Sequence, residues 1–125
     1  MKKLMVLVAL GLVALLAACG SSVPRVNADE TIALMNEGAL LIDVRERYEH
    51  EENRIPDSML LSLSTLELMA PMRLPDLDAV IVVYCRSGRR SAEAAQILVE
   101  LGYTNVHDLG GINRWPYETL SGPIQ

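Results

Sequence analysis

A cysteine and three arginines lie close together in one short segment of the chain: Cys85, Arg86, Arg89 and Arg90. The apolar, β-branched run at 79–84 before them is typical of a buried strand, and the apolar spacing at 91–101 predicts a helix after them. A loop that leads into a helix points several backbone N–H groups at one centre, where the helix dipole adds positive potential. The strand, loop and helix together predict an anion-binding site beside a thiol.

Cys85 is the predicted nucleophile of this segment. A thiol near a helix N-terminus and basic side chains has its pKa lowered from about 8.5 toward neutrality, so it exists largely as thiolate. Gly88 is free to take the backbone conformation that a tight cradle needs. We predict that an incoming oxyanion, or a persulfide on the cysteine, is held by the loop residues Arg86, Ser87, Gly88, Arg89 and Arg90. The alternative is that Cys85 is a buried structural thiol.

The elements that must position this loop alternate along the chain between strand-like and helix-like segments. Short apolar runs predict strands at 39–44, 59–63, 79–84 and 105–109. Helices are predicted from a cap at Asn27 to Gly38, in part of 64–77, at 91–101 and at 112–120. Residues 45–57 are highly charged and are expected to form a solvated loop. The alternation predicts an α/β fold, a small parallel sheet flanked by helices on both faces, with ligands at the carboxyl ends of its strands.

Several segments of the chain resemble single-domain rhodaneses, in the order in which that family has them. Residues 85–91 match the active-site loop, with a cysteine, a glycine three positions later and a serine that opens the helix. Residues 41–45 match the first core strand with its Asp-x-Arg ending, Ile55-Pro56 matches the following turn, and residues 101–115 match the closing strand and helix. The resemblance spans roughly residues 30–118 and implies a rhodanese-like fold.

Two pairs of residues depart from the family pattern. Asn53-Arg54 stands where rhodaneses usually have Gly-His, and Asp57-Ser58 stands where Gly-Ala is common. Both pairs lie after the first core strand, so the fold and the nucleophile are expected to be unaffected. At the end of that strand, Asp43 and Arg45 are expected to form a structural ion pair.

The resemblance implies a sulfurtransferase in which Cys85 carries the sulfur. A donor such as thiosulfate would pass its sulfane sulfur to the cysteine, and a thiophilic acceptor, a thiol or cyanide, would remove it from the persulfide. Such a reaction needs no metal and no organic cofactor. His50 and His107 lack the spacing of metal ligands, so no metal site is predicted.

Three other functions match parts of this pattern. A cysteine-dependent phosphatase of the same fold needs an arginine six positions after its cysteine to bind phosphate bidentately, and this chain has Ser91 there. A thiol–disulfide oxidoreductase is disfavoured because there is no Cys-x-x-Cys. The third alternative is a non-catalytic rhodanese-like binding module, although degenerate modules typically lose the nucleophile that this chain keeps.

The start of the chain predicts export and lipid attachment. Lys2 and Lys3 precede an uncharged apolar run at 4–18, which is the pattern of a signal peptide and is shorter than a comfortable membrane span. Residues 16–19, Leu-Ala-Ala-Cys, resemble the bacterial lipobox, in which the cysteine is lipidated. We predict a signal peptide at 1–18, a lipidated Cys19 and tether at 19–26, and a rhodanese-like domain at 27–125. The domain would then be anchored to a membrane of the bacterial cell envelope, on its periplasmic or extracytoplasmic side.

The net charge of the chain indicates which kinds of partner it can bind. It has 16 Asp and Glu against 11 Lys and Arg, a net charge of −5, and both lysines lie in the predicted signal. Because nucleic acid phosphates are bound by basic faces, nucleic acid is excluded as a partner. The expected partners are a small sulfur-containing anion, a thiol or cyanide acceptor, and membrane lipid through the anchor.

Overall fold

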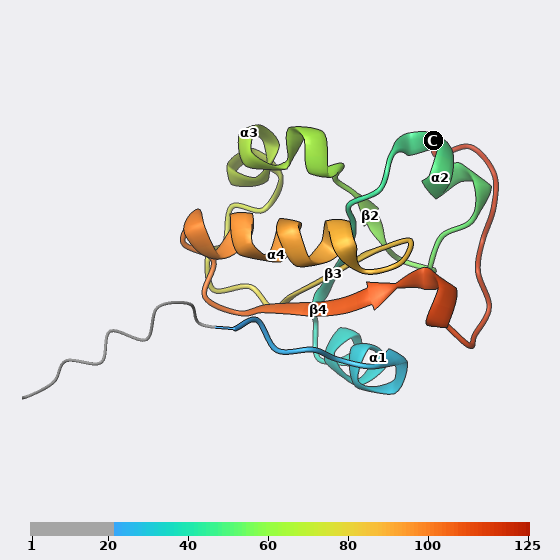
Figure 1. Ribbon diagram of the computed structural model, residues 1–125, viewed down its shortest axis with the longest axis horizontal. Helices are drawn as coiled ribbons and strands as arrows, with labels where there is room; N and C mark the ends of the chain where they lie inside the picture. The colour runs from blue at the N-terminus through green and yellow to red at the C-terminus, as the bar shows by residue number, and fades with distance from the viewer. Residues whose placement is uncertain (1–21) are drawn as a thin grey trace, which may run out of the picture.

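The computed structural model describes residues 22–125, in which helices pack on one parallel sheet (Figure 1). The sheet has four strands in the order β2-β1-β3-β4, and all neighbours run parallel. The strands are β1 (Leu40–Asp43), β2 (Met59–Leu60), β3 (Ile81–Cys85) and β4 (Val106–Gly111). The helices are α1 (Ala28–Asn36), α2 (Arg47–Glu52), α3 (Leu63–Arg73) and α4 (Arg89–Glu100), with a 3-10 turn at Ile112–Arg114. The predicted α/β fold with a parallel sheet is therefore confirmed.

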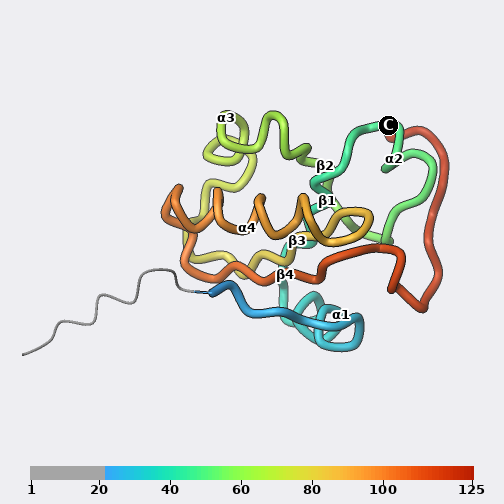
Figure 2. The backbone as a smooth tube through the Cα atoms, in the orientation of Figure 1, coloured from blue at the N-terminus to red at the C-terminus, as the bar shows by residue number. Residues whose placement is uncertain are grey.

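β3 lies inside the sheet and separates two layers of the core. All its residues are buried, as its β-branched sequence predicts. Successive side chains of a strand point to opposite faces. Ile81, Val83 and Cys85 therefore pack with residues of α3 and α4, whereas Val82 and Tyr84 pack with residues of α1 and the 3-10 turn. Figures 1 and 2 show α3 and α4 above the sheet and α1 below it, so helices cover both faces as predicted.

The first helix begins at the predicted cap. The Glu30 N–H donates to the Asn27 side chain at 2.8 Å, and the Asn27 N–H donates to the Glu30 carboxylate at 3.2 Å. This reciprocal capping box satisfies N–H groups that a helix start otherwise leaves free. Gly38, with φ of 102°, follows the last turn of α1, in the conformation that glycine adopts most readily after a helix.

The prediction of a solvated loop at 45–57 is wrong for residues 47–52, which form α2. The Glu46 N–H donates to the Glu49 carboxylate at 2.9 Å at the start of this helix. Arg45, Glu49 and His50 are buried rather than solvated. Their partners are Asp43 and Arg90. Oppositely charged side chains from other parts of the fold pack against this charged run, so these three residues are buried rather than solvated.

The predicted helix at 112–120 is also wrong, because only the 3-10 turn Ile112–Arg114 forms. Trp115 is extended, with φ of −75° and ψ of 115°. Pro116 excludes the helical conformation of the residue before it and has no N–H to donate. The chain beyond runs back over the loop before β2, where Leu120 and Arg54 exchange backbone hydrogen bonds at 2.8 Å.

Residues 24–26 pair with the edge of β4. The Val26 N–H donates to the Asp108 carbonyl at 3.0 Å, and the Asp108 N–H donates to the Pro24 carbonyl at 2.9 Å. The last residues of the predicted tether are therefore part of the folded domain. The predicted signal peptide and Cys19 lie outside the described residues. Within residues 22–125, no helix has the length and apolar character to cross a membrane.

Candidate active site

Cys85 is the last residue of β3, and residues 86–88 carry the chain from it into α4. Gly88 makes the turn with φ of 111°, a left-handed conformation that glycine adopts without steric cost. The turn places the Gly88 N–H close to the sulfur, and it donates to Cys85 Sγ at 3.1 Å. The sulfur thus lies at the carboxyl end of an inner strand and at the N-terminus of α4, which is where sequence reasoning expected it.

The surroundings of Cys85 favour the thiolate. Its side chain is 1 % exposed, and burial by itself raises the pKa of a thiol. Hydrogen bonds from Ser91, through its backbone and its hydroxyl, and from the N–H groups of Gly88 and Ser87 outweigh burial, so the pKa of Cys85 is lowered from its ordinary value. A structural thiol in apolar surroundings has a raised pKa instead. The environment therefore favours a nucleophile over a structural thiol.

The three loop arginines have different surroundings. Arg86 and Arg89 are both exposed, and Arg86 lines a cavity beside the loop. Arg90 is partly buried, and its Nη1 and Nη2 each donate to the Glu49 carboxylate at 2.7 Å. The geometry therefore gives Arg90 a protein partner that the sequence did not reveal. Substrate binding by Arg86, Ser87, Gly88, Arg89 and Arg90 stays a prediction.

The cavity beside the loop has a volume of about 460 Å³. Its lining residues come from α2 and its flanks, the Cys85 loop and the 3-10 turn: Arg45, Tyr48, Glu49, Glu52, Asn53, Arg86, Ile112 and Asn113. The Asn113 N–H donates to the Arg86 carbonyl at 3.3 Å, which joins the turn to the loop. Arg86 is the residue of the Cys85 loop that lines this cavity, next in the chain to Cys85.

Glu49 is a residue of this site that sequence reasoning missed. Its bidentate pair with Arg90 joins α2 to the first turn of α4, directly after the Cys85 loop. The Arg90 hydrogen bonds lower the pKa of Glu49 to about 2, and the same bonds raise the pKa of Arg90. The charged run at 45–57 predicted a solvated loop rather than the helix that carries Glu49. No local pattern indicated Arg90 as the partner.

The Glu49→Gln variant is expected to be less stable than the parent chain, with a different acid sensitivity. The Glu49 carboxyl has a folded-state pKa of about 2, below its ordinary 4.5, so the ion pair contributes fully above pH 4.5 and is lost as the pH falls toward 2. We expect a loss of about 2 kcal/mol in the free energy of unfolding at neutral pH. Urea unfolding of both chains at several pH values measures this difference, which should shrink below pH 4.5.

The matched control is Glu51→Gln, which removes a carboxylate of the same helix. Glu51 pairs with Arg47 at 3.1 Å, and the Arg47 side chain is 66 % exposed. A surface pair of this kind contributes below about 1 kcal/mol. Equal losses in the free energy of unfolding of the two variants would show that the Glu49–Arg90 pair contributes no more to stability than a surface pair.

Asp43 is the centre of a second buried network, at the end of β1. Its carboxylate accepts from Arg45 Nε at 2.9 Å and Nη2 at 2.7 Å, and lies 2.8 Å from His50 Nδ1. Arg45 Nη2 also donates to the Asn53 carbonyl at 2.6 Å. The predicted structural pair of Asp43 and Arg45 is confirmed, and it fixes both ends of α2 near the cavity. In the part of the chain that the structure describes, no group of His, Cys and acidic residues is arranged to hold a metal ion.

The fold and the site have counterparts among known proteins. Residues 27–117 match the family described as Rhodanese-like domain. The chain belongs to the rhodanese-like domain family. The thiosulfate sulfurtransferase GlpE of Pseudomonas syringae pv. syringae is 37 % identical to it over 103 residues, which cover 78 % of this chain and 95 % of that protein.

Two solved structures of other proteins have a fold similar to that of this rhodanese-like chain. The human single-domain sulfurtransferase TSTD1 aligns with a TM-score of 0.67 and 30 % identity, over 74 % of this chain and 94 % of that one. A rhodanese with anions from Escherichia coli aligns with a TM-score of 0.64 and 28 % identity, over 68 % of this chain and 100 % of that one. The resemblance read from the sequence is confirmed, and with it the prediction that the chain is an enzyme of the sulfurtransferase class.

Proposed function

We propose that this rhodanese-like enzyme moves a sulfane sulfur from thiosulfate, or a similar donor, through a persulfide on Cys85. In the first step the Cys85 thiolate attacks the outer sulfur of thiosulfate. The S–S bond of the donor breaks, and sulfite leaves with the bonding electron pair. In the second step a thiolate or cyanide attacks the outer sulfur of the persulfide, and the Cys85 thiolate leaves. Two covalent half-reactions of this kind give ping-pong kinetics without a cofactor.

The observation that carries this proposal is the hydrogen-bonded environment of the sulfur. The Gly88 N–H at 3.1 Å and the N-terminus of α4 favour negative charge at Cys85 in the thiolate, and the same positive end of α4 favours the persulfide anion. The relative GlpE is named a thiosulfate sulfurtransferase, and the Escherichia coli rhodanese is described with anions. Both descriptions support an anionic sulfur donor for this chain.

Arg86 is the loop arginine that we assign to the donor. It is exposed on the wall of the cavity, whereas the Arg90 guanidinium already donates to Glu49. A cation at this place attracts a dianion and screens the charge of the departing sulfite. The loop N–H groups from Arg86 to Arg90 then hold the persulfide.

The intact mass of the purified full-length chain after incubation with thiosulfate tests the persulfide. We expect a gain of one sulfur atom that disappears when cyanide is added, with peptide mapping placing it on Cys85 and not on Cys19. Alkylation of Cys85 without any gain of sulfur would show that the thiol is reactive but that thiosulfate is not its donor. Neither alkylation nor sulfur gain would instead support the non-catalytic binding module.

We also propose that Cys19 is lipidated and holds the domain at the bacterial cell envelope. The support is the lipobox-like sequence at 16–19, at the end of the uncharged apolar run at 4–18 that follows Lys2 and Lys3. In a bacterial host, the parent chain is expected to incorporate labelled fatty acid and to sediment with membranes. The Cys19→Ser variant should lose both properties, whereas Cys85→Ser should keep them. A parent chain without label, recovered in the soluble fraction, would contradict the anchor.

A further inference from the structure

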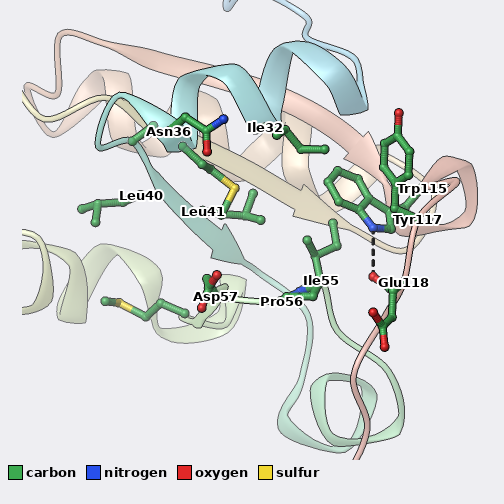
Figure 3. Close-up of a pocket in the computed structure, with 13 residues that line it drawn as sticks. Ile32, Asn36, Leu40, Leu41, Ile55, Pro56, Asp57, Trp115, Tyr117 and Glu118 are labelled. Atoms are coloured by element: carbon green, nitrogen blue, oxygen red, sulfur yellow. Dashed lines mark hydrogen bonds between the residues drawn. The ribbon is translucent and has the colours of Figure 1, made fainter.

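A second cavity, of about 470 Å³, lies on the α1 side of the sheet and shares no lining residue with the cavity beside Cys85. Figure 3 shows it between α1, β1, the turn before β2 and the segment after the 3-10 turn. Most of its lining is apolar: Ile32, Met35, Ala39, Leu40, Leu41, Ile55, Pro56, Met59 and Trp115. Its volume falls within the range of about 300–1,000 Å³ that is typical of small-molecule sites.

Its aromatic wall is held in place by hydrogen bonds. The Trp115 Nε1–H donates to the Glu118 carbonyl at 3.2 Å, the dashed contact in Figure 3. The Tyr117 ring meets the Trp115 ring edge to face, with centroids 5.5 Å apart, and the Tyr117 hydroxyl donates to Asp29 of α1. A wall fixed in this way costs a ligand little ordering entropy on binding.

The charged groups of the cavity have one sign. Asp57 and Glu118 are the charged residues among the described residues that line it, and none of its lining is basic. The C-terminal end of α1, which carries partial negative charge, contributes Met35 and Asn36 to the same cavity. Asp57 and Glu118 are both exposed, and their charge together with the end of α1 favours a cation over an anion at this cavity.

Asp57, in the turn before β2, has an uncommon backbone conformation. Its φ is 65°, the left-handed region, and no other non-glycine residue described in the structure has a positive φ. Aspartate and asparagine are the non-glycine residues that adopt this conformation most readily. The Asp57 carboxylate forms no ion pair with another described residue. Asp57 is exposed and lines the cavity (Figure 3), so its charge is available to a ligand there.

We propose that this cavity binds a small organic cation with an apolar, preferably aromatic, body. The body fills the space over Leu41, Ile55 and the Trp115 ring, and the cationic group lies toward Asp57 and Glu118. Ammonium groups are attracted both by carboxylates and by the faces of indole rings. The site is separate from Cys85, so this inference does not depend on the proposed sulfur transfer.

Trp115 reports on binding directly, because it is the one tryptophan of the chain. The full-length protein is titrated, with Trp115 fluorescence as the readout, using three probes that share a phenylethyl body: 2-phenylethylammonium, 2-phenylethanol and 3-phenylpropionate. We expect a saturable change with the ammonium probe, at an affinity about fivefold above that of the alcohol. The anion should bind more weakly still.

The Asp57→Asn variant separates charge from shape, since asparagine tolerates the left-handed conformation as well as aspartate does. It should weaken binding of the ammonium probe about threefold and leave binding of the alcohol unchanged. Glu93→Gln, which removes an exposed carboxylate on α4, should leave both unchanged. No saturable change with any probe would overturn the site. Equal binding of all three probes, or preference for the anion, would overturn the cationic ligand class.

Discussion

The Cys85→Ser variant is expected to transfer sulfur from thiosulfate to cyanide at least about a thousandfold more slowly than the parent chain. The alcohol of serine stays protonated at neutral pH, whereas the hydrogen bonds from Ser91, Gly88 and Ser87 lower the pKa of the Cys85 thiol. Serine also cannot form a persulfide, so the covalent intermediate is lost altogether. Steady-state thiocyanate production by matched amounts of the two proteins measures the effect.

The control for this variant is the same substitution at the other cysteine, Cys19→Ser. It removes the other cysteine of the chain and should leave the transfer rate unchanged. Because serine is close in size to cysteine, Cys85→Ser should also keep the melting temperature within a few degrees, which thermal unfolding checks. Substantial turnover by a folded Cys85→Ser chain would refute the assignment of the nucleophile.

The second large effect is expected from the addition of one methyl group, in Gly111→Ala. Gly111 has φ of −101° and ψ of 136°, which alanine adopts without strain. A Cβ there would nevertheless lie 2.5 Å from the Arg86 carbonyl oxygen and 2.8 Å from Ser87 Cα, and would collide with the Asn113 side chain. Two of these neighbours are backbone atoms of the Cys85 loop, so the loop itself must move.

We expect Gly111→Ala to lose about 2–3 kcal/mol of stability through overpacking. We also expect its transfer rate to fall at least about tenfold, because the N–H groups around the sulfur are displaced. Urea unfolding and kcat/KM for thiosulfate measure the two effects. The Cys85 pKa, followed by the pH dependence of alkylation, should rise at the same time.

Gly38→Ala provides the matched control for the added methyl group. Gly38 has φ of 102°, but its Cβ would meet no atom within 4 Å. Alanine there should cost about 1 kcal/mol through backbone strain and leave the transfer rate unchanged. If Gly111→Ala is as stable and active as the parent, the close packing of Gly111 on the loop does not hold the site.

Local signals in the sequence were enough to predict the strand, loop and helix that carry Cys85. The β-branched run before the cysteine, Gly88 after it and the helical apolar period beyond it are all local signals, and each corresponds to a feature of β3, the turn or α4. The capping box at Asn27 and Glu30 was readable for the same reason. Pro116 carries a local signal of the same kind, because a residue before proline avoids helical geometry, and the helix predicted at 112–120 was wrong at this point.

The groups that surround the loop could be identified only in the folded chain. Glu49 and Arg90 lie 41 positions apart, and the second cavity gathers α1, β1, the turn at Asp57 and the segment at Trp115. The residue types show which side chains carry a charge. They do not show which oppositely charged side chain each of them packs against in the folded protein. That choice follows from the sheet order β2-β1-β3-β4, which sets the ends of β1 and β3 side by side. The helices that follow them, α2 and α4, are thereby brought into contact, and the charges at 45–54 become part of the site.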